Sequence, residues 1–310
     1  DSGLNSNPTK QLEGGKHMDK NHQNVRYGFI GLGNMGRPMA AHVLRACEHL
    51  TVFDLAGTSE RAPNGARIAQ STEAVVAESD VIALSLPSAK ANHEVIEQIS
   101  RSARSGTVVV DTCTIGPPAA VKNAEVLRAA GIEYVDSPVS GLKFRAEEGS
   151  LASMMAGSDG ACERAAPLID SYSRTVFRVG NAAGQGQRMK VVNNALYISS
   201  LVTTAEALAY GEKGGLEMAK MFEVVNASSG MNFTTAQVFP KFLLEQAGVA
   251  SGAEAHILRK DLELFVQGSS DENTSGAVIA EAFAAIEAFS QADPLQDMME
   301  IVRFVRDRKP

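Results

Sequence analysis

The sequence is poor in cysteine and lacks a long hydrophobic run. Its three cysteines, Cys47, Cys113 and Cys162, cannot all pair within one chain, and their spacing is not that of a metal site. We therefore expect ordinary thiols in a reducing, cytoplasmic compartment and no metal centre. The longest weakly charged stretch, residues 189–211, contains charged, hydroxyl and amide side chains, so it is too polar to span a bilayer.

An excess of positive charge is also missing. Lys and Arg number 29 against 36 Asp and Glu, a net charge of −7, which argues against broad nucleic-acid binding. At 44% hydrophobic and 21% charged residues, the 310-residue chain has the composition of a globular protein of one large or two ordinary domains. Residues 1–24 are polar and glycine-rich, without a secretory segment. The pair His17-Met18 in this stretch is typical of a cloning junction, so we expect a tag or disordered N-terminus.

Short β-branched segments alternate with helical patterns in residues 25–183. The segments expected to be strands lie at 25–31, 50–54, 80–87, 107–111, 132–138, 151–157 and 175–180. Strands that alternate with helices predict an α/β domain in which helices cover both faces of a parallel sheet.

The pattern changes after the glycine-rich stretch 180–187. Residues 185–213 form one helical pattern without proline, about 43 Å long at 1.5 Å per residue, within a predicted interdomain helix 184–214. Its centre is apolar nearly all round, so we expect burial on most faces and subunit contacts along it. Residues 215–310 predict an all-α domain, with helices at 217–226, 235–246, 255–267, 276–290 and 294–307.

A strand-to-helix turn carries three glycines in the spacing G-x-G-x-x-G, namely Gly31, Gly33 and Gly36. Gly31 permits the tight turn, Gly33 lets the backbone approach a pyrophosphate, and Gly36 allows close helix–strand packing. The second strand ends at Asp54, whose carboxylate suits ribose hydroxyls and would repel a 2′-phosphate, which favours NAD over NADP. The cofactor contacts expected within the turn itself also include Leu32, Asn34 and Met35.

Further segments carry polar residues at positions where a buried core would favour apolar ones. Ser140-Gly141 follows a strand and offers backbone and hydroxyl donors for a carboxylate, although a capped loop is the favoured explanation when this segment is taken alone. Lys190 and Asn194 share one face of the long apolar helix. Burial there would lower the pKa of the lysine and make it suitable for proton transfer. The alternative is a lysine whose side chain reaches to solvent. His256 and Lys260 also share a helix face, and for His256 a surface role is favoured.

Together these segments resemble the β-hydroxyacid dehydrogenase family over almost all of residues 26–305. The matching stretches are GFIGLGNMGRPMA, LPS at 86–88, DTCTIGPP, DSPVSG, GQGQRMKVVNN, SSG at 228–230 and KDL at 260–262. The resemblance implies a Rossmann domain joined to a helical domain, a homodimer or homotetramer, and a small hydroxy-acid or semialdehyde substrate. It implies catalysis by Lys190 with Asn194. It further implies a substrate site of Ser140, Gly141, Leu142, Asn194 and Lys260, and nicotinamide-side cofactor contacts from Leu86, Pro87, Thr114 and Lys260.

The sequence departs from the family pattern at several positions. Leu142 stands where a second glycine is common, Cys113 replaces the usual serine, and Ala253 replaces a frequent aromatic residue. Arg145 and His256 could read an extra polar or anionic group on the substrate.

Other assignments stay open from the sequence. An NADPH-dependent reductase of the imine or semialdehyde type is one alternative, but imine reductases usually lack the Ser-Gly loop and the Lys–Asn helix face. 6-Phosphogluconate dehydrogenase normally has a histidine at the position of Asn193. A non-catalytic NAD(P)-binding relative would not need to retain Lys190, Asn194 and Lys260.

Overall fold

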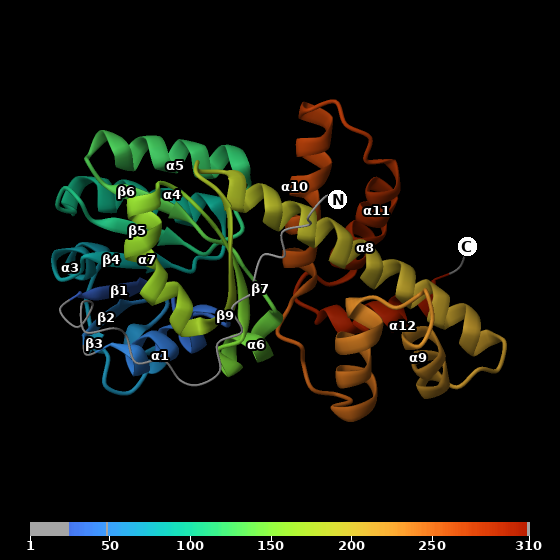
Figure 1. The fold of residues 1–310 in the computed structure, drawn as a ribbon. Coiled ribbons are helices and arrows are strands. Elements are labelled where there is room, and N and C mark those ends of the chain that lie inside the picture. Colours follow the sequence, from blue (N-terminus) through green and yellow to red (C-terminus); the bar gives the residue numbers. More distant parts are fainter. Residues whose placement is uncertain (1–24, 48, 309–310) are drawn as a thin grey trace, which may run out of the picture.

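The computed structural model describes residues 25–47 and 49–308, so the predicted N-terminal tag, 1–24, lies outside the described residues. A sheet covered by helices forms one half of the molecule, and a group of helices forms the other (Figure 1). The long helix α8 (Gln185–Lys213) runs from the sheet into the helical half. Its bounds are those predicted from the sequence.

Nine strands form one sheet, in the order β3-β2-β1-β4-β5-β6-β8-β7 with β9 beside β8. Neighbours from β3 to β6 are parallel, and this order is that of the doubly wound Rossmann sheet, which confirms the predicted fold class. The strands are β1 (Tyr27–Ile30), β2 (Leu50–Phe53), β3 (Arg67–Ile68), β4 (Val81–Leu84), β5 (Val108–Asp111), β6 (Glu133–Asp136), β7 (Val139–Ser140), β8 (Leu151–Ala156) and β9 (Ser173–Gly180).

The alternation of strands and helices had suggested a parallel sheet, but the observed sheet is not parallel throughout. Strand β8 runs antiparallel to both β6 and β7. Between β6 and β8 the chain forms only β7 and the short helix α6 (Leu142–Glu148), which is too little for the crossover that a parallel neighbour needs. Helix α7 (Asp159–Tyr172) then supplies a crossover, and β9 pairs with β8 in parallel.

Successive strand residues alternate between the two faces of the sheet. Phe29 and Val52 pack in a cluster with α1 (Gly36–Ala46) and α7, whereas Ile30 and Ile82 pack in a second cluster with α3 (Thr72–Ala77), α4 (Ala89–Ser102) and α5 (Pro117–Ala129). The short helix α2 (Thr58–Arg61) follows β2. Each fully buried large apolar side chain stabilises the fold by about 1.5–3 kcal/mol. These clusters therefore fix the carboxyl ends of the strands, where the cleft described below opens.

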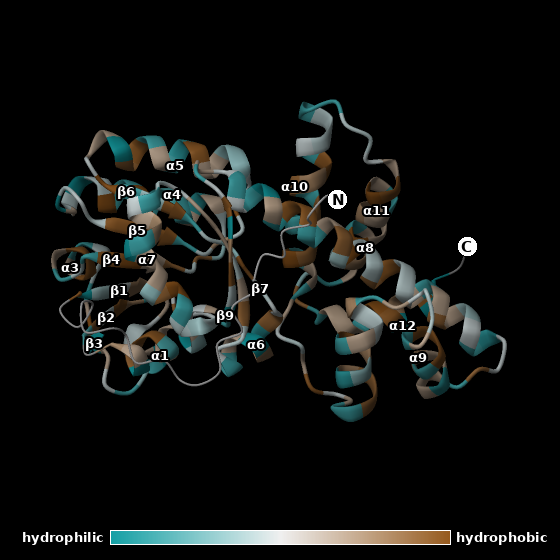
Figure 2. Ribbon diagram, viewed as in Figure 1, coloured by the Kyte–Doolittle hydropathy of each residue, from teal (hydrophilic) through white to brown (hydrophobic). Residues whose placement is uncertain are grey.

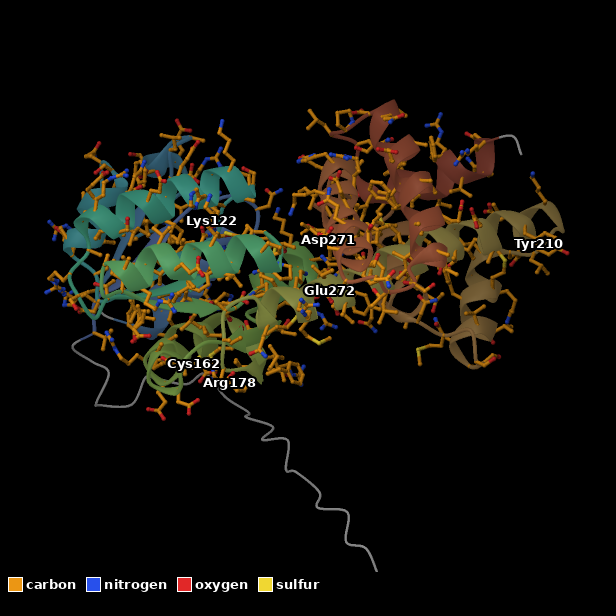
Figure 3. All side chains as sticks on the ribbon, turned by 90° about the horizontal axis from the view of Figure 1, so that it is seen from above. Lys122, Cys162, Arg178, Tyr210, Asp271 and Glu272 are labelled. Atoms are coloured by element: carbon orange, nitrogen blue, oxygen red, sulfur yellow. The ribbon has the colours of Figure 1, made fainter. Side chains whose placement is uncertain are left out.

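Helix α8 is buried along one stripe only, so the expected burial on most faces is wrong for a single chain. Residues such as Ala195, Leu201 and Leu208 are buried. On the other side Leu196 is 68% and Tyr210 83% exposed (Figure 3). The apolar sequence of α8 therefore exceeds what one copy of the chain covers.

The helical half has its own hydrophobic core around α8. Helices α9 (Met218–Asn226), α10 (Ala255–Asp271), α11 (Ala277–Ala292) and α12 (Ile301–Asp307) pack around it, and Figure 2 shows hydrophobic segments on α11 and α12 beside α8. Buried aromatic side chains in this core include Phe222, Phe239 and Phe289.

Two predicted α-helices take other forms. The segment expected at 235–246 winds as π-helix at Thr234–Val238 and Pro240–Glu245, around a proline that has no N–H to donate. The helix expected at 294–307 begins only at a 3-10 turn, Met298–Glu300, because the Asp297 side chain caps the turn by accepting a hydrogen bond from the Met299 N–H.

Candidate active site

A cleft of about 1870 Å³ lies between the sheet and the helical half. It is larger than common small-molecule pockets of about 300–1,000 Å³, so it has room for a dinucleotide beside a small acid. Most of the predicted site residues line it: Gly31, Gly33, Asn34, Met35, Asp54, Leu86, Pro87, Thr114, Ser140, Gly141, Leu142, Lys190, Asn194 and Lys260. Leu32 and Gly36 do not line it.

The glycine turn has the shape of a phosphate cradle. Gly31 has φ +93°, and a Cβ on Gly36 would overlap the carbonyl of Gly31, so both positions need glycine. A Cβ on Gly33 would meet no atom within 4 Å, which leaves this backbone open toward the cleft. Helix α1 begins at Gly36 with no acidic residue in its first turn. The turn therefore fits the pyrophosphate of a nicotinamide dinucleotide.

Leu32 and Asp54 fix the turn from behind. The Leu32 side chain is only 1% exposed and belongs to the core, while its N–H donates to Asp54 Oδ2 at 2.6 Å. Asp54 Oδ1 accepts from the Ala56 N–H at 2.8 Å. Arg61 Nη1 lies 3.9 Å from Asp54 Oδ2. The carboxylate thus stands at the end of β2 in the cleft, where ribose hydroxyls would meet it.

A buried polar network supports the loops after β4 and β5. The Leu86 N–H donates to Cys113 Sγ at 3.0 Å, so the thiol at this position acts as an acceptor. Asp111 accepts from the Cys113 N–H at 3.0 Å and from Asn92 Nδ2 at 2.9 Å. This network holds the loops that bring Leu86 and Thr114 to the cleft, and Cys113 itself also lines the cleft.

The loop after β7 keeps a glycine-like shape. Gly141 has φ +144° and Leu142 has φ +61°, a conformation that costs a non-glycine residue roughly 1–2 kcal/mol. The Leu142 side chain packs against the core of the helical half, and this burial offsets the strain. Leu142 therefore adopts a backbone conformation that glycine adopts without strain.

Lys190 is buried on α8, with 8% of its surface exposed. Among the residues that the structure describes, its Nζ has no hydrogen-bond or salt-bridge partner. Burial lowers the pKa of Lys190 to about 8; the charge of Asp261 opposes this shift, and that of Lys260 adds to it. The amine therefore exchanges a proton near neutral pH, as a general acid–base group requires.

A chain of hydrogen bonds crosses the cleft beside Lys190. Lys260 Nζ donates to the Thr114 carbonyl and to Asp261 Oδ1, both at 2.7 Å. Asn194 Nδ2 donates to Asp261 Oδ2 at 2.7 Å. Asn193 Nδ2 donates to Asn194 Oδ1 at 3.1 Å and to Ser140 Oγ at 3.3 Å. Sequence reasoning named neither Asp261 nor Asn193 as a site residue, although both lie inside the motifs quoted above.

Gln187 joins the start of α8 to the sheet. It is fully buried, and its Oε1 accepts from the N–H groups of Ile115 and Gly116 at 2.9 and 3.1 Å. Its Nε2 donates to the Cys113 carbonyl and to Asp136, each at 2.9 Å. Lys190 lies one turn further along the helix, so this residue sets the place of the amine.

Arg145 and His256 both line the cleft, but only His256 has polar partners. His256 Nδ1 lies 3.0 Å from the Pro294 carbonyl and 3.3 Å from Glu254 Oε2. The guanidinium carbon of Arg145 lies 5.3 Å from the ring centre of Phe233. No carboxylate within the described residues pairs with it.

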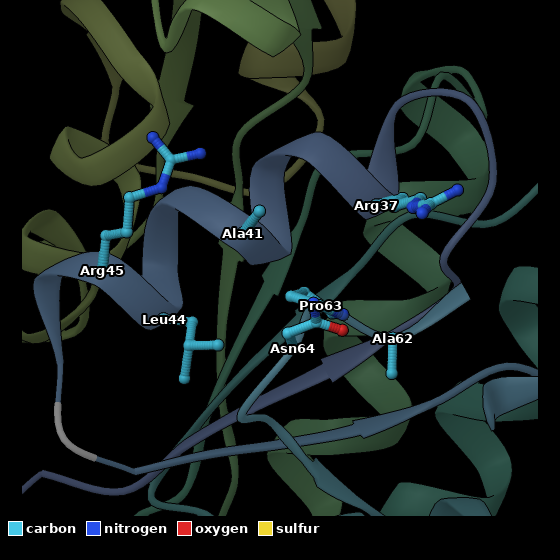
Figure 4. A pocket seen from close by; sticks show the side chains of 7 residues that line it. All are labelled: Arg37, Ala41, Leu44, Arg45, Ala62, Pro63 and Asn64. Carbon is cyan, nitrogen blue, oxygen red and sulfur yellow. The ribbon is translucent and has the colours of Figure 1, made fainter. Parts of the chain in front are cut away.

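A smaller hollow of about 330 Å³ lies beside α1 (Figure 4). Its lining is Arg37, Ala41, Leu44, Arg45, Ala62, Pro63 and Asn64, without a proton acceptor of suitable pKa. Within residues 25–47 and 49–308, no cluster of His, Cys, Asp or Glu could hold a metal ion. Across the same ranges, none of the helices is long and apolar enough to cross a membrane.

Comparisons with known proteins agree with this geometry. Residues 26–180 match the family model described as the NAD binding domain of 6-phosphogluconate dehydrogenase. Residues 184–305 match the model described as NAD-binding of NADP-dependent 3-hydroxyisobutyrate dehydrogenase.

Individual relatives match along most of their length. The chain is 33% identical to 2-(hydroxymethyl)glutarate dehydrogenase of Eubacterium barkeri, over 86% of this chain and 89% of that protein. It is 35% identical to NAD-dependent L-serine dehydrogenase of Pseudomonas aeruginosa, over 76% and 82%. The structure of Mycobacterium tuberculosis 3-hydroxyisobutyrate dehydrogenase with L-serine matches with a TM-score of 0.83 and 26% identity, over 91% of this chain and 99% of that one. The chain therefore belongs to the β-hydroxyacid dehydrogenase family and is a nicotinamide-dependent oxidoreductase.

Proposed function

We propose that the protein catalyses reversible hydride transfer between a 3-hydroxy acid, or its semialdehyde, and NAD(H), with Lys190 as proton acceptor and donor. The observation that carries this proposal is the buried amine of Lys190 in the cleft, which has no partner among the described residues and has a pKa of about 8. In this proposal residues 25–183 hold the cofactor, the helix within 184–214 carries the amine, and residues 215–310 close the cleft.

The protein's own groups would divide the work as follows. A bound nicotinamide ring supplies the hydride acceptor or donor. As the C–H bond of the substrate's carbinol breaks, neutral Lys190 accepts the hydroxyl proton, and in the reverse direction its ammonium returns it. The Asp261 carboxylate holds the side chains of Asn194 and Lys260 in the cleft through bonds of 2.7 Å, where they would orient the substrate. Thr114 anchors Lys260 to the sheet.

The substrate carboxylate would bind at the loop after β7. Ser140 already accepts a hydrogen bond from Asn193, and the positive φ of Gly141 and Leu142 turns the backbone of the loop. The relatives named above are dehydrogenases of 2-(hydroxymethyl)glutarate, of L-serine and of 3-hydroxyisobutyrate. Each of these acids carries a hydroxymethyl group on the carbon next to a carboxylate. A carboxylate anchor and one proton-transfer group suit all three.

NAD is the proposed cofactor because Asp54 stands where a 2′-phosphate would lie. Its carboxylate is held by the Leu32 and Ala56 N–H groups, so it cannot turn away from an approaching phosphate. Arg61, at 3.9 Å, is already drawn toward this carboxylate.

The test of the proposed function replaces Lys190 with alanine. We expect kcat for oxidation of 3-hydroxyisobutyrate to fall by about 10²–10⁴-fold, the contribution of a general base, with NADH binding unchanged in a fluorescence titration. Lys122→Ala is the matched control, because Lys122 is an exposed lysine on α5 (Figure 3). Turnover retained in the Lys190 variant would refute the role of Lys190.

We further propose that the protein is a homodimer or homotetramer assembled along α8. Val192, Leu196 and Tyr210 are exposed and lie on one side of this helix at 3.6 residues per turn. Such a row of apolar side chains is typical of an interface. Light scattering of the native protein tests this, and a monomeric mass would contradict it.

A further inference from the structure

Arg145 is a cation in the cleft that lacks a counter-ion. It is half-buried on α6, and across the described part of the chain no carboxylate lies within salt-bridge distance of it. The acids on the same helix have other partners: Glu147 faces Lys143 at 3.5 Å and Glu148 accepts from Ser150 at 3.0 Å. A half-buried charge without a partner costs free energy unless a ligand supplies one.

The side chain of Arg145 begins at the loop proposed to hold the substrate carboxylate. A Cβ added to Gly141 would lie 2.8 Å from both Cβ and Cδ of Arg145, so the stem of the arginine packs directly on this glycine. Ser140 precedes Gly141 in the same loop and accepts the hydrogen bond from Asn193 on α8. Arg145 is therefore an immediate neighbour of the loop that is proposed to bind the substrate carboxylate.

The head of Arg145 reaches across the cleft to the helical half. Its guanidinium carbon lies 5.3 Å from the ring centre of Phe233, which packs edge-on against Tyr197 at 5.8 Å between ring centres. Tyr197 is four residues beyond Asn193, about 6 Å along α8. The guanidinium and the Asn193–Ser140 contact thus line the same cleft next to neighbouring turns of α8. This arrangement suits a second charged group on a side arm of the substrate.

The surroundings of Arg145 favour an anion. The ring of Phe144 lies 6.0 Å from the guanidinium carbon, and Lys241 Nζ lies 3.9 Å from the centre of the same ring. Two cations on aromatic rings produce a positive potential around Arg145, which itself lines the cleft. A guanidinium can bind a carboxylate through two parallel hydrogen bonds.

We propose that Arg145 binds a second carboxylate of the substrate, so that the preferred substrates are dicarboxylic 3-hydroxy acids. This proposal rests on the proposed function, since it assigns the side arm of the same hydroxymethyl acid. A methyl arm leaves Arg145 without a partner, and an ammonium arm, as in L-serine, is repelled by it. A carboxylate arm, as in 2-(hydroxymethyl)glutarate, pairs with it.

The first test measures binding and does not need turnover. Isothermal titration of the protein with bound NAD compares 2-methylglutarate with 2-methylbutyrate, two unreactive acids that differ by the second carboxylate. We expect roughly 10- to 100-fold tighter binding of 2-methylglutarate, the usual contribution of a charge-assisted bidentate pair. Arg145→Gln should abolish this ratio, Arg145→Lys should keep part of it, and Arg128→Gln, which removes an exposed arginine on α5, should leave it unchanged.

The second test measures kcat/KM for 2-(hydroxymethyl)glutarate and 3-hydroxyisobutyrate. We expect Arg145→Gln to lower the first value by roughly 10- to 100-fold and to leave the second within about threefold. Equal binding of the two unreactive acids by the wild type, or equal losses for both substrates in Arg145→Gln, would overturn the role of Arg145. If neither substrate yields NADH, the proposed function fails, and the binding ratio still decides whether Arg145 reads a carboxylate.

Discussion

Asp261 controls the charge around Lys190, and replacing it with asparagine tests the proton-transfer hypothesis most directly. Asparagine has nearly the same shape but no charge. The carboxylate of Asp261 raises the pKa of Lys190 against the effect of burial, while Lys260 lowers it. In Asp261→Asn the favourable charge is lost and Lys260 loses its salt bridge of 2.7 Å. Both changes destabilise the ammonium form of Lys190, so its pKa must fall.

The size of the shift follows from the geometry. An opposite charge within about 4–6 Å shifts a pKa by about 1–3 units. Because Lys190 makes no direct hydrogen bond to Asp261, we expect the low end, roughly one unit or about 1.4 kcal/mol. Oxidation needs neutral Lys190, so wild-type kcat/KM should decline as pH falls below about 8. In the variant the decline should begin roughly one pH unit lower, with a lower plateau because Asn194 and Lys260 are no longer held.

The assay is NADH formation measured from well below to well above neutral pH. Asp271→Asn is the control, since Asp271 is an exposed carboxylate at the other end of the same helix, α10 (Figure 3). Its profile should coincide with that of the wild type. If the Asp261 variant keeps the wild-type inflection, or moves it upward, the titrating group is not Lys190 and the reasoning fails.

Three further substitutions test the supports of the site. Asp54→Asn should lower kcat/KM for NAD by roughly tenfold and so reduce the preference for NAD over NADP. Steady-state kinetics with both cofactors measures this preference, and an unchanged ratio of the two kcat/KM values would exclude Asp54 as the discriminating group. Gln187→Met should reduce the free energy of unfolding by about 3 kcal/mol or more, seen in denaturant titration, because several buried partners of Gln187 lose their bonds. The Leu142→Ala variant should be about 1 kcal/mol less stable than the Leu142→Gly variant in the same titration, because residue 142 has φ +61°. The reverse order would show that no strain is stored at this position.

The sequence predicted the features that depend on local pattern. The apolar segments that end at Asp54 and Asp111 identified buried strands, and the proline-free stretch 185–213 gave the exact bounds of α8. The features it missed are too short or too dependent on tertiary contacts to leave such a pattern. Strands β3 and β7 have two residues each, and the antiparallel direction of β8 depends on what the chain does between β6 and β8.

The site residues named from the sequence came from local spacing joined to the family resemblance. The glycine turn was expected because its glycines stand between a strand and a helix, and Lys190 and Asn194 because they share a helix face and match the family pattern. Asp261 lies 67 residues from Asn194, and Lys260 lies 146 residues from Thr114, so no spacing rule connects them. A carboxylate next to a lysine in a helix is normally read as a surface ion pair. Only the packing of α10 against α8 shows that this one is buried in the cleft.

The contacts that join the two halves are also the contacts that set the chemistry. Lys260 bonds to the sheet at Thr114, Asn193 bonds to Ser140, and Leu142 of the sheet half packs in the helical core. The pKa of Lys190 depends on the burial that these contacts create. If these contacts open when the cofactor enters, Lys190 gains water and its pKa should rise again. The proposed base would then work best in the closed cleft, so closure and proton transfer would be linked through the burial of one amine.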